Sequence, residues 1–417
     1  MAHFGFLTLS MMGHLFPMST FALALQSRGH RVTFFCFADA HEFLQQAGLN
    51  TVVIAAAEFP LGYAKRVSDT LSQLSGAKGV AYTIGELCHQ AAAQFVELPD
   101  AIRSAHVDAL VIDQFAMSGA TIADFLKLPY VHVAAALMAN VEDGLPPINV
   151  GFGPERNPFA LIRNRLATVL VKRVFRPIRT TLNERRRSWG LPVYTEFFNE
   201  RFYGGPQISQ EPPSFEFHRK TLPSNFHFVG PLHRRESRNE VPFPWERLDG
   251  RPLIYASMGT LQNGLDWVFR TFAEGCAGLD VQLVLSLGGN LDPADFAGLP
   301  ANPVVVRFAP QLQLLERAAV CITHAGLNTA LEALAKGVPM VAIPITNDQP
   351  GVAARITWAG AGKSLSLKKL NTKLLREAVS HVMDVPSYRS NAQRLQQEIV
   401  RTNSLQRACD IAEALVQ

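Results

Sequence analysis

The sequence predicts an α/β protein made of two doubly wound domains that face a central cleft. Short apolar runs that fit buried strands alternate with segments of helical periodicity, which is typical of parallel sheets. The 417 residues exceed one ordinary hydrophobic core and fit two domains of about 200 residues each. A polar stretch with several prolines, residues 230–244, separates the two series of elements. Ligands of two such sheets bind where the strand ends face each other.

Residues 1–225 are expected to form the first domain. Strands at residues 4–9 and 32–37, joined by a helix at 16–27, make a βαβ unit, in which the strands are parallel. The other predicted elements are strands at 51–54, 109–112 and 130–134 and a helix at 85–105.

Residues 226–250 are expected to form a linker and residues 251–390 a second domain of the same kind. Its predicted strands cover residues 253–257, 282–287, 304–308, 320–323 and 340–343. Residues 391–417 have helical periodicity, so we expect one C-terminal helix there.

Composition narrows the class of function. The chain is 48% hydrophobic and 18% charged, as in a globular protein, and its net charge of +4 gives no argument for nucleic acid. Five cysteines without a CxxC pair favour a reduced, cytoplasmic protein and disfavour structural zinc. No apolar stretch reaches the roughly 20 residues of a spanning helix. The apolar N-terminus lacks a basic leader, so we expect it to belong to the fold rather than to a signal peptide.

The stretch 308–349 carries the clearest functional pattern. Its apolar run at 320–323 leads through a glycine, expected to permit a tight turn, into a helical pattern. A helix that begins at a strand end presents free N–H groups and a positive dipole end, which suits a phosphate or diphosphate. The residues expected to converge there are His324, Gly326, Asn328 and Thr329. Glu332 follows one turn later and can accept bonds from a ribose diol. A simple fold connection explains this pattern equally well.

Two further residues suit acid–base chemistry. His14 follows the first predicted strand, and an imidazole with a pKa near ~6.5 can act as a general base. Asp113 follows the strand at 109–112 and should lie on the same rim, where its carboxylate can orient the imidazole. The alternatives are a histidine that only hydrogen-bonds a helix start and an aspartate that caps the next helix.

These patterns together resemble the nucleotide-sugar signature of the family 1 UDP-dependent glycosyltransferases. The matching elements, in the order of the family, are Phe-Ala-Pro-Gln at 308–311, the T-H-x-G-x-N-[ST]-x-x-E core at 323–332, Gly-Val-Pro at 337–339 and Asp-Gln at 348–349. The resemblance implies the GT-B fold, with the C-terminal helix returning to the first domain. Phe308 stands where the plant enzymes usually have Trp. It therefore keeps a π face for uracil but has no indole N–H.

The resemblance also implies roles for individual residues. His14, preceded by Gly13, would deprotonate an acceptor hydroxyl, and Asp113 would orient it. The residues implied to bind the UDP-sugar are Ser257, Gly259, Thr260, Phe308, Gln311, His324, Gly326, Asn328, Thr329, Glu332, Asp348 and Gln349. Asp348 and Gln349 would recognise the hexose, with Gln favouring glucose, although Asp348 also suits a helix cap.

We expect neither a metal nor another cofactor, because the sequence contains no cluster of metal ligands. The helix start and His324 would neutralise the departing UDP. The expected reaction is a single in-line displacement with an oxocarbenium-like transition state, which turns an α-linked donor into a β-glycoside.

The acceptor is suggested by a narrower resemblance. The stretches 207–211, 218–223, 226–232 and 348–356 resemble bacterial zeaxanthin glucosyltransferases. This implies UDP-glucose as the donor and a lipophilic hydroxylated acceptor, with flavonoids, sterols and macrolides as alternatives. Because methionine fills irregular shapes, we expect an adaptable acceptor pocket. The residues expected to line it are Met11, Met12, Phe16, Phe115 and Met117.

Residues 156–187 are rich in arginine interleaved with apolar residues. A basic amphipathic helix of this kind can rest on anionic lipid, and a solvated helix of the acceptor domain explains it equally well. Nucleic-acid binding is disfavoured, since no aromatic platform or known module accompanies the charge. We expect a cytoplasmic monomer, with peripheral membrane contact through this segment as an option.

Three other functions fit the sequence less well. An NAD-dependent oxidoreductase would need G-x-G-x-x-G after the first strand, which residues 10–19 lack. A non-catalytic nucleotide-sugar binder would have lost His14, Asp113 or His324. A UDP-sugar 2-epimerase would need carboxylate chemistry at the sugar instead of a base for an incoming hydroxyl.

Overall fold

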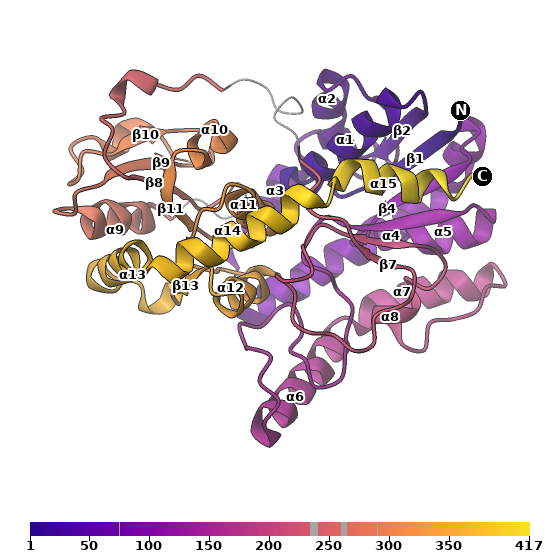
Figure 1. Ribbon diagram of the computed structural model, residues 1–417. Coiled ribbons are helices and arrows are strands. Elements are labelled where there is room, and N and C mark those ends of the chain that lie inside the picture. Colours follow the sequence, from indigo (N-terminus) through magenta and orange to yellow (C-terminus); the bar gives the residue numbers. More distant parts are fainter. Residues whose placement is uncertain (75, 234–240, 260–264, 290) are drawn as a thin grey trace.

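The protein has two lobes, and its C-terminal helices run from one lobe to the other (Figure 1). The computed structural model describes residues 1–74, 76–233, 241–259, 265–289 and 291–417. Each lobe contains one sheet of parallel strands. The predicted α/β class with two Rossmann-like domains is therefore confirmed.

The first domain holds a seven-stranded sheet with the order β3-β2-β1-β4-β5-β6-β7. Its strands are β1 (His3–Leu7), β2 (Arg31–Cys36), β3 (Asn50–Val53), β4 (Ala109–Asp113), β5 (Tyr130–Ala134), β6 (Gln207–Ser209) and β7 (Phe226–Phe228). Its helices are α1 (Met12–Ser27), α2 (Ala38–Gln46), α3 (Tyr63–Gln73), α4 (Gly76–Ala105), α5 (Gly119–Leu126), α6 (Pro158–Val174), α7 (Arg176–Ser188) and α8 (Phe197–Glu200).

The second domain holds a six-stranded sheet with the order β10-β9-β8-β11-β12-β13. Its strands are β8 (Leu253–Ser257), β9 (Gln282–Ser286), β10 (Val304–Val306), β11 (Ala318–Thr323), β12 (Met340–Ala342) and β13 (Gly362–Ser364). The helices from here to the C-terminus are α9 (Asp266–Cys276), α10 (Gln311–Leu315), α11 (Leu327–Ala335), α12 (Gln349–Trp358), α13 (Thr372–Asp384), α14 (Pro386–Arg401) and α15 (Ser404–Glu413). Short 3₁₀ turns lie at Trp245–Arg247, Pro293–Phe296 and Leu367–Lys369.

Strand β4 shows why the strands are uninterrupted apolar runs. Val111 belongs to one hydrophobic cluster, whereas its neighbours Leu110 and Ile112 belong to another. Successive strand residues point to opposite faces, so a strand covered by helices on both faces must be apolar throughout. The first polar side chain, Asp113, then falls at the carboxyl end of β4.

Two of the expected boundaries are corrected. Residues 226–228, expected to open the linker, form β7 and pair with β6, so the first domain continues beyond residue 225. Within the expected linker, residues 234–240 lie outside the described residues. The expected single C-terminal helix is two helices, because Asn403 adopts a left-handed conformation with φ of 45° between α14 and α15. Helix α14 contacts α11, whereas α15 contacts α1 of the first domain (Figure 1).

The two domains share one hydrophobic cluster. Leu137 and Phe215 of the first domain belong to the same cluster as Val352, Ile356 and Leu395 of the second. The interface between the lobes is therefore packed as a core, which fixes how their strand ends face each other. Among the described residues, none of the helices has the length and apolar character needed to cross a membrane.

Candidate active site

The candidate residues lie at equivalent positions of the two sheets. In each sheet the strand order reverses between two adjacent strands, β1 and β4 in the first and β8 and β11 in the second. The carboxyl ends of the strands at such a reversal form a crevice in which ligands bind. In the first pair of strands, His14 lies after β1 and Asp113 ends β4. In the second pair, Ser257 ends β8 and His324 follows β11, and Ser257 is in register with Thr323.

His14 and Asp113 form a tightly held pair. The His14 Nδ1 atom lies 2.6 Å from Oδ2 of Asp113, whose side chain is fully buried. The Thr8 hydroxyl donates to the same Oδ2 at 3.0 Å, and the Phe115 N–H donates to Oδ1 at 3.0 Å. A carboxylate fixed in this way keeps the proton of a neutral imidazole on Nδ1, so Nε2 of His14 is the nitrogen that can accept a proton.

The pKa of His14 is set by opposing effects. Burial lowers the pKa, but the carboxylate of Asp113, and more weakly that of Asp348, raise it, and the balance lies above the ordinary 6.5. Asp348 belongs to the second domain, so part of the field on His14 comes from across the interface. Burial raises the pKa of Asp348 in turn.

His324 lies in a narrow space between two glycines. A Cβ atom on Gly326 would lie 2.5 Å from Nε2 of His324, and one on Gly259 would lie 2.6 Å from its Cε1. In the tight turn expected at Gly326, the left-handed residue is Ala325, with φ of 64°, while Gly326 is extended and is the N-cap residue of α11. Position 326 therefore requires glycine because a side chain there would collide with the His324 imidazole. The expected reason, the backbone conformation of the turn, is corrected.

The charge of His324 also differs from expectation. Burial lowers its pKa to about 4, so the imidazole is neutral near pH 7. It can therefore donate one hydrogen bond to a phosphate oxygen but cannot neutralise its charge. Any favourable potential for an anion comes from the start of α11, whose first N–H groups have no partner within the helix.

The polar residues on and near α11 are joined by hydrogen bonds. Asn328 Nδ2 donates to the backbone oxygen of Gly13 at 2.5 Å and so links the two domains beside His14. Gln311 accepts from the Tyr255 hydroxyl at 2.9 Å and donates to Glu332 at 2.5 Å and to Thr329 at 3.4 Å. Glu332 is buried, and its carboxylate contacts Gln311 where a ribose contact was expected.

The remaining donor-side residues lie around the same crevice. The Phe308 side chain is 48% exposed, and the tip of its ring lies close to Gly289. The Ser257 hydroxyl accepts from the Gly259 N–H at 3.3 Å. Thr260, which was expected to bind the diphosphate, lies outside the described residues.

Asp348 and Gln349 do not use their side chains in the same way. Oδ2 of Asp348 accepts from the Leu137 N–H of the first domain at 3.0 Å, and although the residue precedes α12, its side chain does not cap that helix. Oε1 of Gln349 accepts from the Ile345 and Thr346 N–H groups at 2.8 and 3.1 Å. The side-chain carbonyl of Gln349 therefore already accepts hydrogen bonds within its own loop, and its side-chain N–H groups are the part of the amide that can bind a sugar.

The five residues expected to line the acceptor pocket lie in different surroundings. Phe115 lies beside His14, with the two rings edge to face and 6.0 Å apart. Phe16 instead packs against Phe43 and lines a pocket with Asn328 and Glu332, because an α-helix turns roughly 200° between residues 14 and 16. Met117 is buried with its sulfur 3.2 Å from Nη1 of Arg201. Met12 packs against the core, and Met11 precedes α1.

Supporting residues that the sequence did not single out surround the segment after β5. Gln114 donates to the backbone oxygens of Ala136 and Leu137 and accepts from the Ala139 N–H, and Gln210 donates to two further backbone oxygens of this segment. Both glutamines are buried just beyond a strand end. A polar residue directly after a buried strand was the available signal for them, as it was for Thr8.

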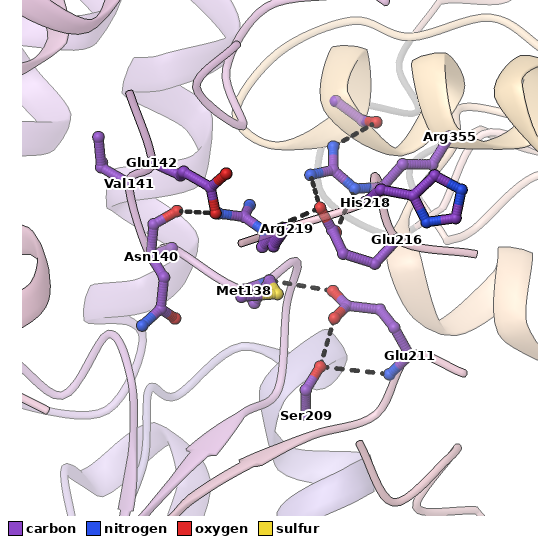
Figure 2. A network of polar contacts seen from close by, with 12 residues as sticks. Met138, Asn140, Val141, Glu142, Ser209, Glu211, Glu216, His218, Arg219 and Arg355 are labelled. Carbon is purple, nitrogen blue, oxygen red and sulfur yellow. Dashed lines mark hydrogen bonds and ion pairs between the residues drawn. The ribbon is translucent and has the colours of Figure 1, made fainter. Parts of the chain in front are cut away.

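A buried ion pair between Arg355 and Glu216 joins the two domains (Figure 2). Arg355 of α12 is 1% exposed and binds Glu216 through two bonds, Nε to Oε2 at 2.5 Å and Nη2 to Oε1 at 2.7 Å. Glu216 also accepts from Arg219 at 3.0 Å, and Arg219 donates to the backbone oxygen of Asn140 at 2.9 Å. Because Asp348 immediately precedes α12, this pair positions the helix that follows Asp348 against the first domain.

Two facing Rossmann-like domains, one carrying a histidine–aspartate pair and the other a helix that starts at a strand end, define the GT-B fold of glycosyltransferases. A solved glycosyltransferase of kitacinnamycin superposes on this structure with a TM-score of 0.78 at 21% identity, covering 100% of this chain and 99% of the other, which supports the fold. The UDP-glucoronosyl and UDP-glucosyl transferase model matches residues 207–402.

The curated relatives show the family. The chain is 31% identical to a zeaxanthin glucosyltransferase of Pseudescherichia vulneris over 374 residues, which cover 88% of this chain and 86% of the relative. It is 29% identical to a zeaxanthin glucosyltransferase of Pantoea ananas over 418 residues, which cover 100% of this chain and 96% of the relative. The chain belongs to the UDP-glycosyltransferase family and is a hexosyltransferase-type enzyme, as the signature in residues 308–349 predicted.

Proposed function

We propose that this protein is an inverting glycosyltransferase that moves glucose from UDP-glucose to a hydroxyl group of a lipophilic small molecule, with a carotenoid such as zeaxanthin as the favoured acceptor. The observation that carries the proposal is the His14–Asp113 pair, held opposite the start of α11 by the bond from Asn328 to Gly13. The proposal takes His14 as the base on one side of the sugar and the start of α11 as the site for the leaving diphosphate on the other.

The reaction follows from these positions. Nε2 of His14 takes the proton of the acceptor hydroxyl, whose oxygen attacks the anomeric carbon. The bond from that carbon to the UDP oxygen breaks, and UDP leaves with the electron pair on the opposite face. The N–H groups of α11 and one hydrogen bond from His324 receive the diphosphate. Asp348 and the amide of Gln349 hold the glucose, and the product is a β-glycoside.

The proposal requires no metal or other cofactor, since backbone N–H groups and the helix dipole stabilise the leaving group. It places the enzyme in the cytoplasm as a monomer, where the five free cysteines stay reduced. The carotenoid is favoured by the two zeaxanthin glucosyltransferases among the relatives. Phe115, next to His14, offers an apolar wall for such an acceptor.

The test is UDP release from UDP-glucose in the presence of zeaxanthin, a flavonol, a sterol or no acceptor, with and without EDTA. We expect release that depends on zeaxanthin and is unaffected by EDTA, together with a product whose anomeric proton has the coupling of a β-linkage. UDP release with the flavonol or the sterol, but not with zeaxanthin, would show that the acceptor belongs to another chemical class. An α-linked product would contradict the displacement mechanism, and failure to bind UDP would contradict the donor site.

The pH dependence of the wild-type enzyme follows from the state of His14. The base is active when neutral, so kcat/KM should fall about tenfold per pH unit as the pH drops below the pKa of His14, which lies above 6.5. In Asp113→Asn the burial remains while the main opposing charge is lost, so the pKa of His14 should move below 6.5. NMR titration of the histidine side chains measures this shift, and His324, with a pKa of about 4, serves as the unchanged control. A His14 pKa that is equal in both proteins would contradict the pairing.

The space around His324 gives a prediction for UDP affinity. The methyl group of Gly326→Ala would lie 2.5 Å from Nε2 of His324, so the ring or the start of α11 must move. Strain of about 1–3 kcal/mol corresponds to a loss of about 5- to 150-fold in affinity. Isothermal titration calorimetry with UDP measures the loss. Gly85→Ala is the matched control, because a Cβ atom at Gly85 would meet nothing within 4 Å. Equal UDP affinity in both variants would exclude His324 from the site.

A further inference from the structure

Helix α6 carries an apolar face that points to solvent. Its five exposed apolar side chains recur at helical spacing and fall within an arc of about 100° of the helix surface. They are Phe159 (86% exposed), Ile162 (58%), Leu166 (66%), Val169 (63%) and Leu170 (62%). Helix α6 lies at the outer end of the first domain and projects away from its sheet (Figure 1).

The opposite face of α6 is anchored to the domain. Ala160 and Asn164 are buried, and the Asn164 amide donates to the backbone oxygen of Gly144 at 2.8 Å. The Asn157 side chain caps the first turn by accepting from the Ala160 N–H at 2.9 Å, and the helix contacts α4 and α7. A helix anchored in this way cannot rotate to bury its outer face, so that face is available to a partner.

The same region has a net positive charge, whereas the rest of the chain has a net negative charge. Residues 156–187 contain ten of the 39 basic residues of the chain and one of its 35 acidic residues. The rest of the chain therefore contains 29 basic and 34 acidic residues. By helical geometry, Arg165 and Lys172 border one edge of the apolar face and Arg163 the other, while Arg173 lies within it. Among the described residues, Arg173 and Arg176 are exposed and form no ion pair.

We propose that α6 docks its apolar face into the surface of an anionic membrane. Apolar side chains flanked by cations fit the boundary between acyl chains and negatively charged headgroups. A second copy of this chain fits less well, because packing face on face would bring the basic edges of the two helices together. A single-stranded nucleic acid would need a series of aromatic side chains for stacking, and Phe159 is the single aromatic among the five.

The position of α6 connects this docking to the active site. The segment between β5 and α6 contacts the donor loop twice, through the Leu137 N–H to Asp348 at 3.0 Å and through the Asn149 amide to the backbone oxygen of Asn347 at 3.2 Å. It then leads directly into α6. A docked α6 would hold this side of the interface near the bilayer, where a lipophilic acceptor dissolves. The docking goes beyond the proposed reaction and is measured without turnover.

The experiment is co-sedimentation of the full chain with vesicles of phosphatidylcholine alone or with about 30% phosphatidylglycerol. We expect binding to the anionic vesicles that falls at least about tenfold between roughly 50 and 500 mM NaCl. The triple variant Phe159→Gln, Leu166→Gln, Leu170→Gln should bind at least about tenfold more weakly. Its matched control, Leu61→Gln, Val96→Gln, Val400→Gln, alters apolar residues outside α6 that are 77%, 69% and 70% exposed, and should bind like the wild type.

A second pair of variants tests the charge. Arg173→Glu with Arg176→Glu should lose anionic-vesicle binding, whereas Lys368→Glu with Lys369→Glu, which changes the net charge equally on the other domain, should retain it. Circular dichroism and UDP binding verify that each variant is folded. The proposal is overturned if the wild type does not sediment with anionic vesicles, or if the α6 variants bind as the controls do. Sedimentation velocity showing a dimer that only the α6 variants dissociate would assign this face to a second copy instead.

Discussion

His14→Ala is expected to lower kcat by about 10²- to 10⁴-fold, the usual contribution of a positioned general base. Nε2 of His14 is the nitrogen available for a proton, because Asp113 occupies Nδ1. UDP affinity should be unchanged, since the donor residues lie on the second domain. The measurement is kcat with saturating UDP-glucose and zeaxanthin, beside calorimetry with UDP.

His30→Ala provides a closely matched control. His30 also bonds a carboxylate, with Nε2 2.9 Å from Oε1 of Glu413, and its side chain is 13% exposed against 12% for His14. It lies where α1 ends and α15 packs, so its loss should leave kcat unchanged. If both variants lost activity to the same extent, the effect of His14 would be structural and the general-base role would be wrong.

Asp113→Asn separates positioning from base chemistry. An amide can donate to Nδ1, which would place the proton on Nε2 and remove the base, so kcat should fall about as far as in His14→Ala. Because both residues act through one nitrogen, the double variant should be no slower than His14→Ala alone. Multiplicative losses in the double variant would show that the two residues act independently.

Arg355→Met is expected to cause the largest loss of stability among single substitutions at the domain interface. It leaves the Glu216 carboxylate buried with Arg219 as its remaining ion-pair partner, and breaking a buried pair in this way costs about 3–5 kcal/mol. Because the pair joins the domains, thermal unfolding should begin at lower temperature and separate into two transitions. Differential scanning calorimetry shows both effects.

The kinetic effect of the same substitution should be specific to the donor. Arg355 holds the helix that follows Asp348, so KM for UDP-glucose should rise more than KM for the acceptor. Arg165→Met is the control, since Arg165 forms a comparably short but exposed pair with Asp143, 2.6 Å long, and its loss should not be detectable in either measurement. If Arg355→Met melted in one transition at the wild-type temperature, the pair would not hold the domains together.

Much of the fold and of the site was predictable because its signals are local. The apolar run of β4 ends at Asp113 because a strand buried on both faces becomes polar only at its end. The strand, turn and helix that carry His324 lie within the 18 successive residues Ala318–Ala335, so their pattern appears directly in the sequence. The short β7 and the break between α14 and α15 were missed, because three residues give little periodicity and Asn403 adopts positive φ without a glycine.

The sequence by itself determined the two α/β domains, the strand ends that carry His14, Asp113 and His324, and the family signature. Only the tertiary structure decided which of these residues meet. The bonds from Asn328 to Gly13, from Leu137 to Asp348 and from Arg355 to Glu216 join residues separated by 315, 211 and 139 positions. The reason is physical: periodicity reflects the geometry of one segment, whereas a contact between distant segments depends on how two finished surfaces fit. The need for Gly326, the division of the acceptor residues between two sides of α1 and the outward apolar face of α6 all depend on that fit.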